Sequence, residues 1–210
     1  MKTPIPMRSV ALSILLIGLL AQCHEPNIAN RDYFPLNENT DWEYLHQYFA
    51  TDDNKSFLWA DTVKLTIKGD TVLDGITYKK VVDDLSAINK ALRKEGNKYY
   101  GRNHELYAGF TNEYLFLDED ATLNTTWTHD KGNGNRTVYT VEAVNSSRTY
   151  NGTTYPDVME LKVEYFIGDD LHYKTQHYYA RGVGEIYAFY PYPSSLTYSD
   201  LDVSLLHYAP

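Results

Sequence analysis

Residues 62–68 read Thr-Val-Lys-Leu-Thr-Ile-Lys, and this stretch decides the class of fold. Val63, Leu65 and Ile67 share one face of an extended chain, while the residues between them are polar. Apolar residues at every second position indicate a β-strand that buries one face and leaves the other in water. The stretch therefore predicts a sheet with one wet face, which is typical of antiparallel folds.

The same alternation recurs in residues 136–144, 157–165 and 201–208. The chain also has 20 tyrosines, and aromatic residues favour the pleated, half-buried surface of a sheet. Short turn signals separate the segments: Lys68-Gly69-Asp70, Asp74-Gly75, Glu95-Gly96-Asn97, Gly132-Asn133-Gly134, Asn151-Gly152 and Gly168-Asp169-Asp170. Together these features predict one all-β domain with many hairpins over residues 33–210, with at most one short helix.

Residues 83–95 fit two structures. Their apolar side chains recur at helical spacing, at Leu85, Ile88, Ala91 and Leu92. The alternative is a loop followed by a strand over residues 91–94, which turns at residues 95–97. We favour the strand because the segment belongs to an internal repeat.

The repeat has two matched parts. Residues 75–81 and 152–158 share Gly, Thr, Tyr and Val at equivalent positions, and each glycine follows Asp or Asn, as in tight hairpin turns. Further along, Tyr99-Tyr100-Gly-Arg resembles Tyr178-Tyr179-Ala-Arg. The matches predict two similar β-units, and chance similarity in a chain rich in Tyr and Thr is the alternative.

The first 22 residues are typical of a cleaved signal peptide. Lys2 and Arg8 precede an apolar run over residues 10–21, which is shorter than the ~20 residues that a spanning helix needs. Cys23, the only cysteine of the chain, follows at once. Its position favours lipid attachment over a role in the fold, with residues 23–32 as a lipidated tether.

The stretch Leu20-Ala-Gln-Cys23 resembles the bacterial lipobox, although Gln22 replaces the usual small residue. The resemblance implies fatty acylation, such as palmitate, on Cys23 and a cell-envelope location, at the outer membrane rather than the inner. A simple membrane anchor and an ordinary secretory signal are the alternatives. Which side of the membrane the domain faces stays open.

The charge of the chain excludes several partners. Its formal net charge is −9, and loss of the basic leader makes the remainder more acidic. Such a chain is not suited to nucleic acid or to anionic lipid surfaces. Without a second cysteine, the fold depends on its core alone.

Motifs for catalysis or cofactors are absent from the sequence. It has no Gly-x-Ser-x-Gly nucleophile elbow, and its seven histidines are scattered. His172 and His177 are five residues apart, so on a regular strand they face opposite sides and do not form a zinc pair. Residues 118–120 with Asn124 offer oxygens to calcium, but a charged hairpin end explains them better. We therefore predict no cofactor, no metal and no enzyme activity.

The aromatic carboxy-terminal stretch is the main candidate for binding. Pro191 and Pro193 argue against a central strand there. An exposed loop of rings could stack on a glycan or dock a peptide, although packing in the core is the favoured alternative. The candidate residues are Tyr187, Phe189, Tyr190, Tyr192 and Tyr198.

A family resemblance follows from motifs that keep their order along most of the chain. Residues 33–36 (Tyr-Phe-Pro-Leu), then Trp42-Glu-Tyr44, and finally residues 179–184 (Tyr-Ala-Arg-Gly-Val-Gly) resemble a family of secreted lipoproteins of Bacteroidetes with no assigned biochemical role. Asp41 departs from the motif before Trp42. The resemblance implies a curved antiparallel sheet or half-barrel, like that of periplasmic lipoprotein carriers, and supplies no catalytic residues.

Three functions remain. The first is a non-catalytic envelope lipoprotein that binds a glycan, lipid or protein. The second is a carrier that holds a hydrophobic ligand inside the half-barrel. The third is a hydrolase, which is disfavoured because no acid–base pair is recognisable.

Substitution of the anchor cysteine tests the targeting prediction. We expect Cys23→Ala to abolish acyl labelling and to release the protein into soluble fractions, because the acyl chains supply the membrane affinity. Metabolic labelling with a fatty acid and fractionation measure both effects. Unchanged membrane association would contradict the lipoprotein interpretation.

Overall fold

The computed structural model describes residues 32–50, 55–84, 87–105, 109–132, 134–191 and 200–210. No described residue is helical, and no membrane-spanning helix occurs among them. The strands are β1 (Asp41–Phe49), β2 (Phe57–Leu73), β3 (Ile76–Asp83), β4 (Ile88–Glu95), β5 (Lys98–Glu105), β6 (Gly109–Phe110), β7 (Tyr114–Asp118), β8 (Thr126–Gly132), β9 (Asn135–Tyr150), β10 (Thr153–Ile167), β11 (Asp170–Ala180), β12 (Gly184–Tyr190) and β13 (Leu201–Ala209).

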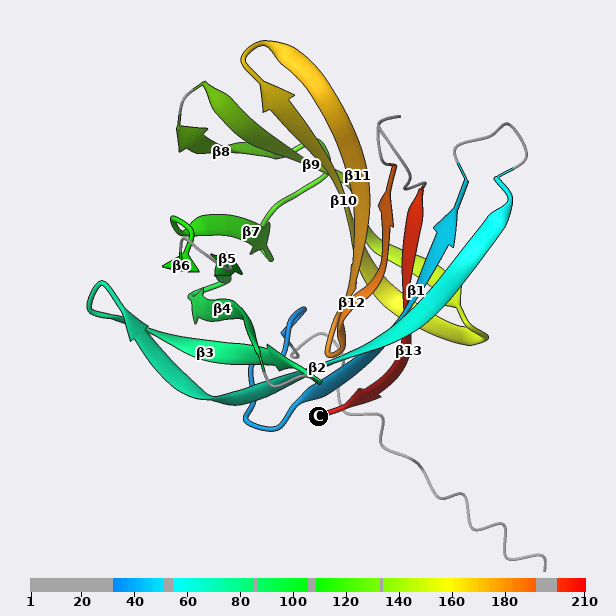
Figure 1. The fold of residues 1–210 in the computed structure, drawn as a ribbon, viewed down its shortest axis with the longest axis horizontal. Coiled ribbons are helices and arrows are strands. Elements are labelled where there is room, and N and C mark those ends of the chain that lie inside the picture. The colour runs from blue at the N-terminus through cyan, green and yellow to red at the C-terminus, as the bar shows by residue number, and fades with distance from the viewer. Residues whose placement is uncertain (1–31, 51–54, 85–86, 106–108, 133, 192–199) are drawn as a thin grey trace, which may run out of the picture.

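The strands form one curved antiparallel sheet in the order β6-β5-β4-β3-β2-β1-β13-β12-β11-β10-β9-β8, and β7 also pairs with β5. Along this path most neighbours are consecutive in sequence. The exception is β1, which pairs with β13 from Asp41↔Ala209 to Tyr48↔Leu201. The sheet curls into a nearly closed half-barrel, with β7 and β8 on the same side (Figure 1). No strand pairing joins β7 to β8 in the described chain.

These strands confirm the all-β prediction and most of its details. Residues 83–95 hold the end of β3 and all of β4, so the strand interpretation is correct. One expected turn is wrong: Lys68-Gly69-Asp70 lies inside β2, where the register against β3 shifts between Ile67 and Asp70. Gly69 has φ +67°, which fits a bulge as well as a turn.

Only one of the two matched parts of the sequence repeat has a similar structure in both copies. The Asp74-Gly75 and Asn151-Gly152 turns both have two residues with positive φ, the geometry of a tight hairpin. The tyrosine pairs differ, because Tyr99 lies two strands after its hairpin, on β5, whereas Tyr179 lies one strand after, on β11. The similarity is therefore confined to the two hairpins.

The segment before β1 packs into the core of the half-barrel. Tyr33 is 1% exposed; its hydroxyl donates to Asp157 (2.5 Å) and its backbone N–H donates to Glu119 (2.6 Å). Phe34 and Leu36 pack against both hydrophobic clusters of the core. The described chain begins with Asp32, whose backbone oxygen already accepts from the Gly182 N–H (2.6 Å). This segment therefore joins the two clusters into one core.

Trp42 links the start of the sheet to the turn between β11 and β12. Its indole N–H donates to the Val183 carbonyl (2.6 Å), and its side chain is 1% exposed. The next residue, Gly184, has φ +111°, and a Cβ atom there would lie 2.8 Å from the indole nitrogen. The chain turns at residues 181–183, and the close approach of the indole explains a glycine at residue 184.

A pair of glycine substitutions tests this contact. We expect Gly184→Ala to lower the free energy of unfolding by about 3 kcal/mol, because it adds a clash with Trp42 to the positive-φ strain. Gly152→Ala is the matched control, since φ is +78° there and nothing lies within 4 Å of the added Cβ. It should cost only ~1 kcal/mol. Equal losses in urea unfolding would show that the indole contact does not matter.

Candidate functional site

The half-barrel encloses an inner cavity of about 390 Å³. Aromatic side chains form the largest part of its wall: Phe34, Trp42, Tyr44, Tyr114, Phe116, Tyr139, Tyr165, Tyr179 and Tyr190. The remaining lining residues are Leu65, Val81, Leu92, Val163, Lys90, Asn103, His104, His177 and Glu185. A cavity of this size, with mostly aromatic walls and a few polar groups, is typical of a small-molecule site.

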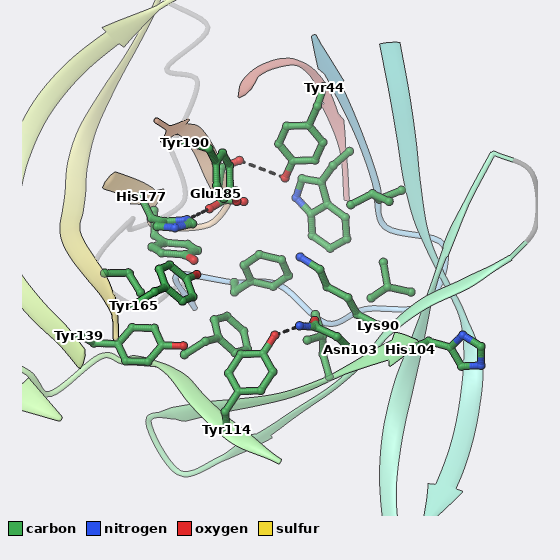
Figure 2. A pocket seen from close by; sticks show the side chains of 18 residues that line it. Tyr44, Lys90, Asn103, His104, Tyr114, Tyr139, Tyr165, His177, Glu185 and Tyr190 are labelled. Carbon is green, nitrogen blue, oxygen red and sulfur yellow. Dashed lines mark hydrogen bonds and ion pairs between the residues drawn. The ribbon is translucent and has the colours of Figure 1, made fainter. Parts of the chain in front are cut away.

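Both halves of the sheet build this cavity. Lys90 comes from β4 and Asn103 from β5, while His177 and Glu185 come from β11 and β12 across the interior (Figure 2). Alternate residues of each strand point inward, so each strand contributes only one or two groups. The site therefore exists only when the two halves are joined.

A buried His–Glu pair is the strongest polar feature of the wall. His177 Nδ1 lies 2.6 Å from Glu185 Oε1, and the side chains are 11% and 17% exposed. The other ring nitrogen of His177 lies 2.8 Å from the hydroxyl oxygen of Thr175, which is fully buried. Both nitrogens of the ring are therefore engaged, and its orientation is fixed.

The charge of Glu185 is stabilised where it lies. Burial alone would raise the pKa of this carboxyl, but the hydrogen bond and charge of His177 outweigh burial, with further help from Lys90 and Tyr179. The pKa of Glu185 is therefore below its usual range. At neutral pH the cavity holds a carboxylate, which is already hydrogen-bonded to the imidazole.

The tyrosine hydroxyls of the cavity stay protonated. Burial raises the pKa of Tyr114 to about 12. Burial also raises the pKa values of Tyr139 and Tyr165, and it raises those of Tyr44, Tyr179 and Tyr190 well above the usual range. These phenols therefore present neutral hydrogen-bonding groups on otherwise apolar rings.

A second, outer cavity of about 560 Å³ adjoins the inner one. The two cavities share four lining residues: Asn103, Tyr114, Tyr139 and Tyr165. The outer cavity also involves His129 of β8, whose ring lies 5.6 Å from that of Tyr114. It therefore lies where β7 and β8 approach each other, on the route from the inner cavity to the open side of the sheet.

The three described members of the predicted aromatic loop are not brought together, and the expectation of no central strand is wrong for them, because Tyr187, Phe189 and Tyr190 lie on β12, which pairs with both β11 and β13. Tyr190 lines the inner cavity, but Tyr187 stacks on Tyr150 at a ring distance of 4.7 Å. Phe189 lies under the Lys55 ammonium, 5.0 Å from its ring centre. The remaining candidates, Tyr192 and Tyr198, lie outside the described residues, as does Cys23. An aromatic binding loop thus stays a prediction.

Sequence reasoning missed the polar residues of the cavity. His177 had no role in the sequence predictions beyond the exclusion of a zinc pair with His172, yet it is 8% exposed and lines the cavity. Part of a signal was present, because Gly182-Val183-Gly184 favours a turn, and a hairpin there places His177 and Glu185 diagonally across two paired strands. The pairs His177↔Ala188 and Tyr179↔Glu185 confirm that register. The His177 side chain points inward because of the curvature of the whole sheet, and no local sequence pattern predicts that curvature.

The acidic turn at residues 118–120 has partners within the protein. Glu119 accepts from the Tyr99 hydroxyl (2.6 Å) and from Lys94 (3.2 Å), and Asp120 accepts from the Asn97 amide (2.9 Å). The charged character of this turn is confirmed, but the expected hairpin is wrong, because β7 pairs with β5 and no pairing joins it to β8 in the described chain. Among the described residues, no group of three or more His, Cys, Asp or Glu side chains is placed to hold a metal.

Hydrolysis of glycosides by a pair of carboxylates finds no support in this wall. Among the described residues that line the inner cavity, Glu185 is the one carboxylate, and that chemistry needs two of them across the scissile bond. Thr175 is hydrogen-bonded to His177 but is fully buried and does not line the cavity. The arrangement is suited to holding a ligand.

Comparison with known proteins adds little. No family model matches the sequence, and no curated protein matches it. One similar solved structure is that of a candidate lipoprotein from Parabacteroides distasonis ATCC 8503. The two chains share 11% identity with a TM-score of 0.44, over 85% of this chain and 99% of that one. At that level the similarity carries no argument about function.

The charge of Glu185 has a measurable effect on stability. Its folded-state pKa is depressed, so its contribution is present above the ordinary value of about 4.3 and is lost as pH falls through the folded value. We expect Glu185→Gln to lower the free energy of unfolding by roughly 1–3 kcal/mol at pH 7. The gap between variant and wild type should shrink below about pH 4.

The exposed Glu142→Gln substitution is the matched control for urea unfolding at pH 7 and at low pH. It should change stability little at either pH. A deficit for Glu185→Gln that does not depend on pH would mean that packing, rather than charge, explains the loss.

Proposed function

We propose that this protein is a lipid-anchored lipoprotein of the bacterial envelope whose half-barrel binds a small organic ligand without transforming it. The observation that carries the proposal is the inner cavity of about 390 Å³, with aromatic walls and a few fixed polar groups. The signal-like leader and Cys23 support the anchor, with the outer membrane as its site.

A carrier for purely hydrophobic ligands fits the cavity less well. Apolar ligands favour cavities in which no charge is left without a partner, because burying an unpaired charge is costly. Here Lys90 and Glu185 both face the ligand space, together with the neutral hydroxyls of the tyrosines. The ligand therefore combines a flat or apolar body with polar groups.

The state of the reactive groups supports the proposal of binding without catalysis. Glu185 Oε1 and His177 Nδ1 are already hydrogen-bonded to each other at 2.6 Å, and His177 Nε2 is hydrogen-bonded to the Thr175 hydroxyl. A general base must reach the proton of a substrate, and a nucleophile must be accessible to it. Thr175 is 0% exposed and does not line the cavity. These groups therefore serve to shape and orient the site.

A neutral aromatic probe tests for a working cavity. We expect the purified, lipidated full chain to bind one molecule of N-phenyl-1-naphthylamine, as counted by native mass spectrometry. Leu65→Trp should weaken this binding about tenfold or more, because the larger side chain occupies part of the inner cavity.

Leu58→Trp is the matched control, because Leu58 lies on the same strand but is 48% exposed. It should leave binding unchanged, and thermal melting should show that both variants fold. Probe binding that Leu65→Trp does not affect, or no binding at all, would contradict a ligand site in the inner cavity.

A further inference from the structure

Lys90 and Asn103 form a pair of donors on the wall of the inner cavity. They lie directly opposite each other in the register of β4 and β5, so both side chains project from the same face of the sheet. Figure 2 shows the Lys90 ammonium reaching into the cavity with the Asn103 side chain beside it. Two neighbouring donors thus line one cavity.

The Lys90 ammonium has no carboxylate at ion-pair distance within the described chain. Glu185 is the one carboxylate among the described lining residues, and its closest partner is His177 at 2.6 Å. Lys90 acts on Glu185 through its field rather than through a contact. The positive charge of Lys90 therefore has room for a second, direct partner.

Asn103 is oriented by a neighbour so that its amide can donate. The Tyr114 hydroxyl donates to the side-chain oxygen of Asn103 at 2.8 Å. Among the described residues, no group accepts a hydrogen bond from the Asn103 side-chain NH₂. Because the oxygen is engaged, the free face of this side chain is its two-proton donor.

We propose that the inner cavity binds an organic anion, with a carboxylate or phosphate group held between the Lys90 ammonium and the Asn103 amide. The apolar body of the ligand lies against Phe34, Trp42 and Phe116. This proposal rests on the proposed ligand-binding function of the same cavity. An anion is favoured over a neutral ligand because it supplies the missing partner of Lys90 and forms charge-assisted hydrogen bonds. A neutral ligand would cover that charge without compensating it.

A matched pair of probes separates this proposal from simple cavity binding. 1-Anilinonaphthalene-8-sulfonate carries an anionic group, and N-phenyl-1-naphthylamine is the same framework without it. We expect the purified full chain to bind the sulfonate about tenfold more tightly than the neutral probe, since hydrogen bonds to charged groups are worth that much. Titration followed by native mass spectrometry measures both affinities.

Substitutions then locate the anion subsite. Lys90→Gln should weaken sulfonate binding about tenfold while leaving the neutral probe unchanged, and Asn103→Leu should give a smaller loss of the same kind. Lys64→Gln is the control, because Lys64 is paired with Asp41 (2.7 Å) and does not line the cavity. Thermal melting shows whether each variant folds.

Competition assigns the chemistry of the anion. Displacement of the sulfonate by 4-phenylbutyrate supports a carboxylate ligand, and displacement by phenyl phosphate supports a phosphate ligand, whereas 4-phenylbutyramide should displace little. Equal affinity for the two probes, or equal loss of both in Lys90→Gln, would overturn the anion proposal and leave the cavity function intact. Failure of both probes to bind would overturn the cavity function and the anion proposal with it.

Discussion

The pairing of β1 with β13 is the constraint on which the rest of the structure depends. It is the one contact along the sheet that joins strands from opposite ends of the sequence, and all the other pairs on the path follow chain order. Without this pairing, no backbone hydrogen bonds along the path would join the run of strands β1–β6 to the run β8–β13. Trp42 reinforces the junction, since it lies on β1 and donates to Val183 in the turn before β12. The inner cavity depends on this pairing, because its opposing walls come from the two different runs of strands.

The sequence predicts the parts of this fold that are local. Strict alternation identifies β2 at residues 62–68, and paired Asx-Gly turns identify two hairpins, because one or two residues determine such features. The bulge at Gly69 resembles a turn in sequence, since both need positive φ, and only the pairing with β3 distinguishes them. The direction in which His177 or Lys90 points is not local. It depends on the sense of curvature, which the long-range closure between β1 and β13 sets.

The abundance of tyrosine has a physical explanation in the cavity. A phenylalanine would fill the same space, but it would leave the Glu185 backbone oxygen and the Asn103 side-chain oxygen without the tyrosine hydroxyls that donate to them. Tyr44 donates to the backbone oxygen of Glu185 (3.1 Å), and Tyr114 donates to Asn103 (2.8 Å). Burial keeps the phenols neutral, so they add polar contacts without adding charge. The cavity thereby combines apolar surface with a small number of fixed polar groups.

The two ends of the half-barrel are not equivalent. Phe34 lies against Trp42 and Phe116, at ring distances of 5.0 Å and 5.8 Å, and lines the inner cavity. Phe34 does not line the outer cavity, which lies where Tyr114 and His129 face each other across the open side of the sheet. Between β7 and β8 there is a contact of aromatic rings and no strand pairing in the described chain. Side chains rearrange far faster than hydrogen-bonded strands separate. Entry of a ligand past Tyr114 therefore needs no strand pair to break, whereas entry past Phe34 would disrupt the core that holds both halves together.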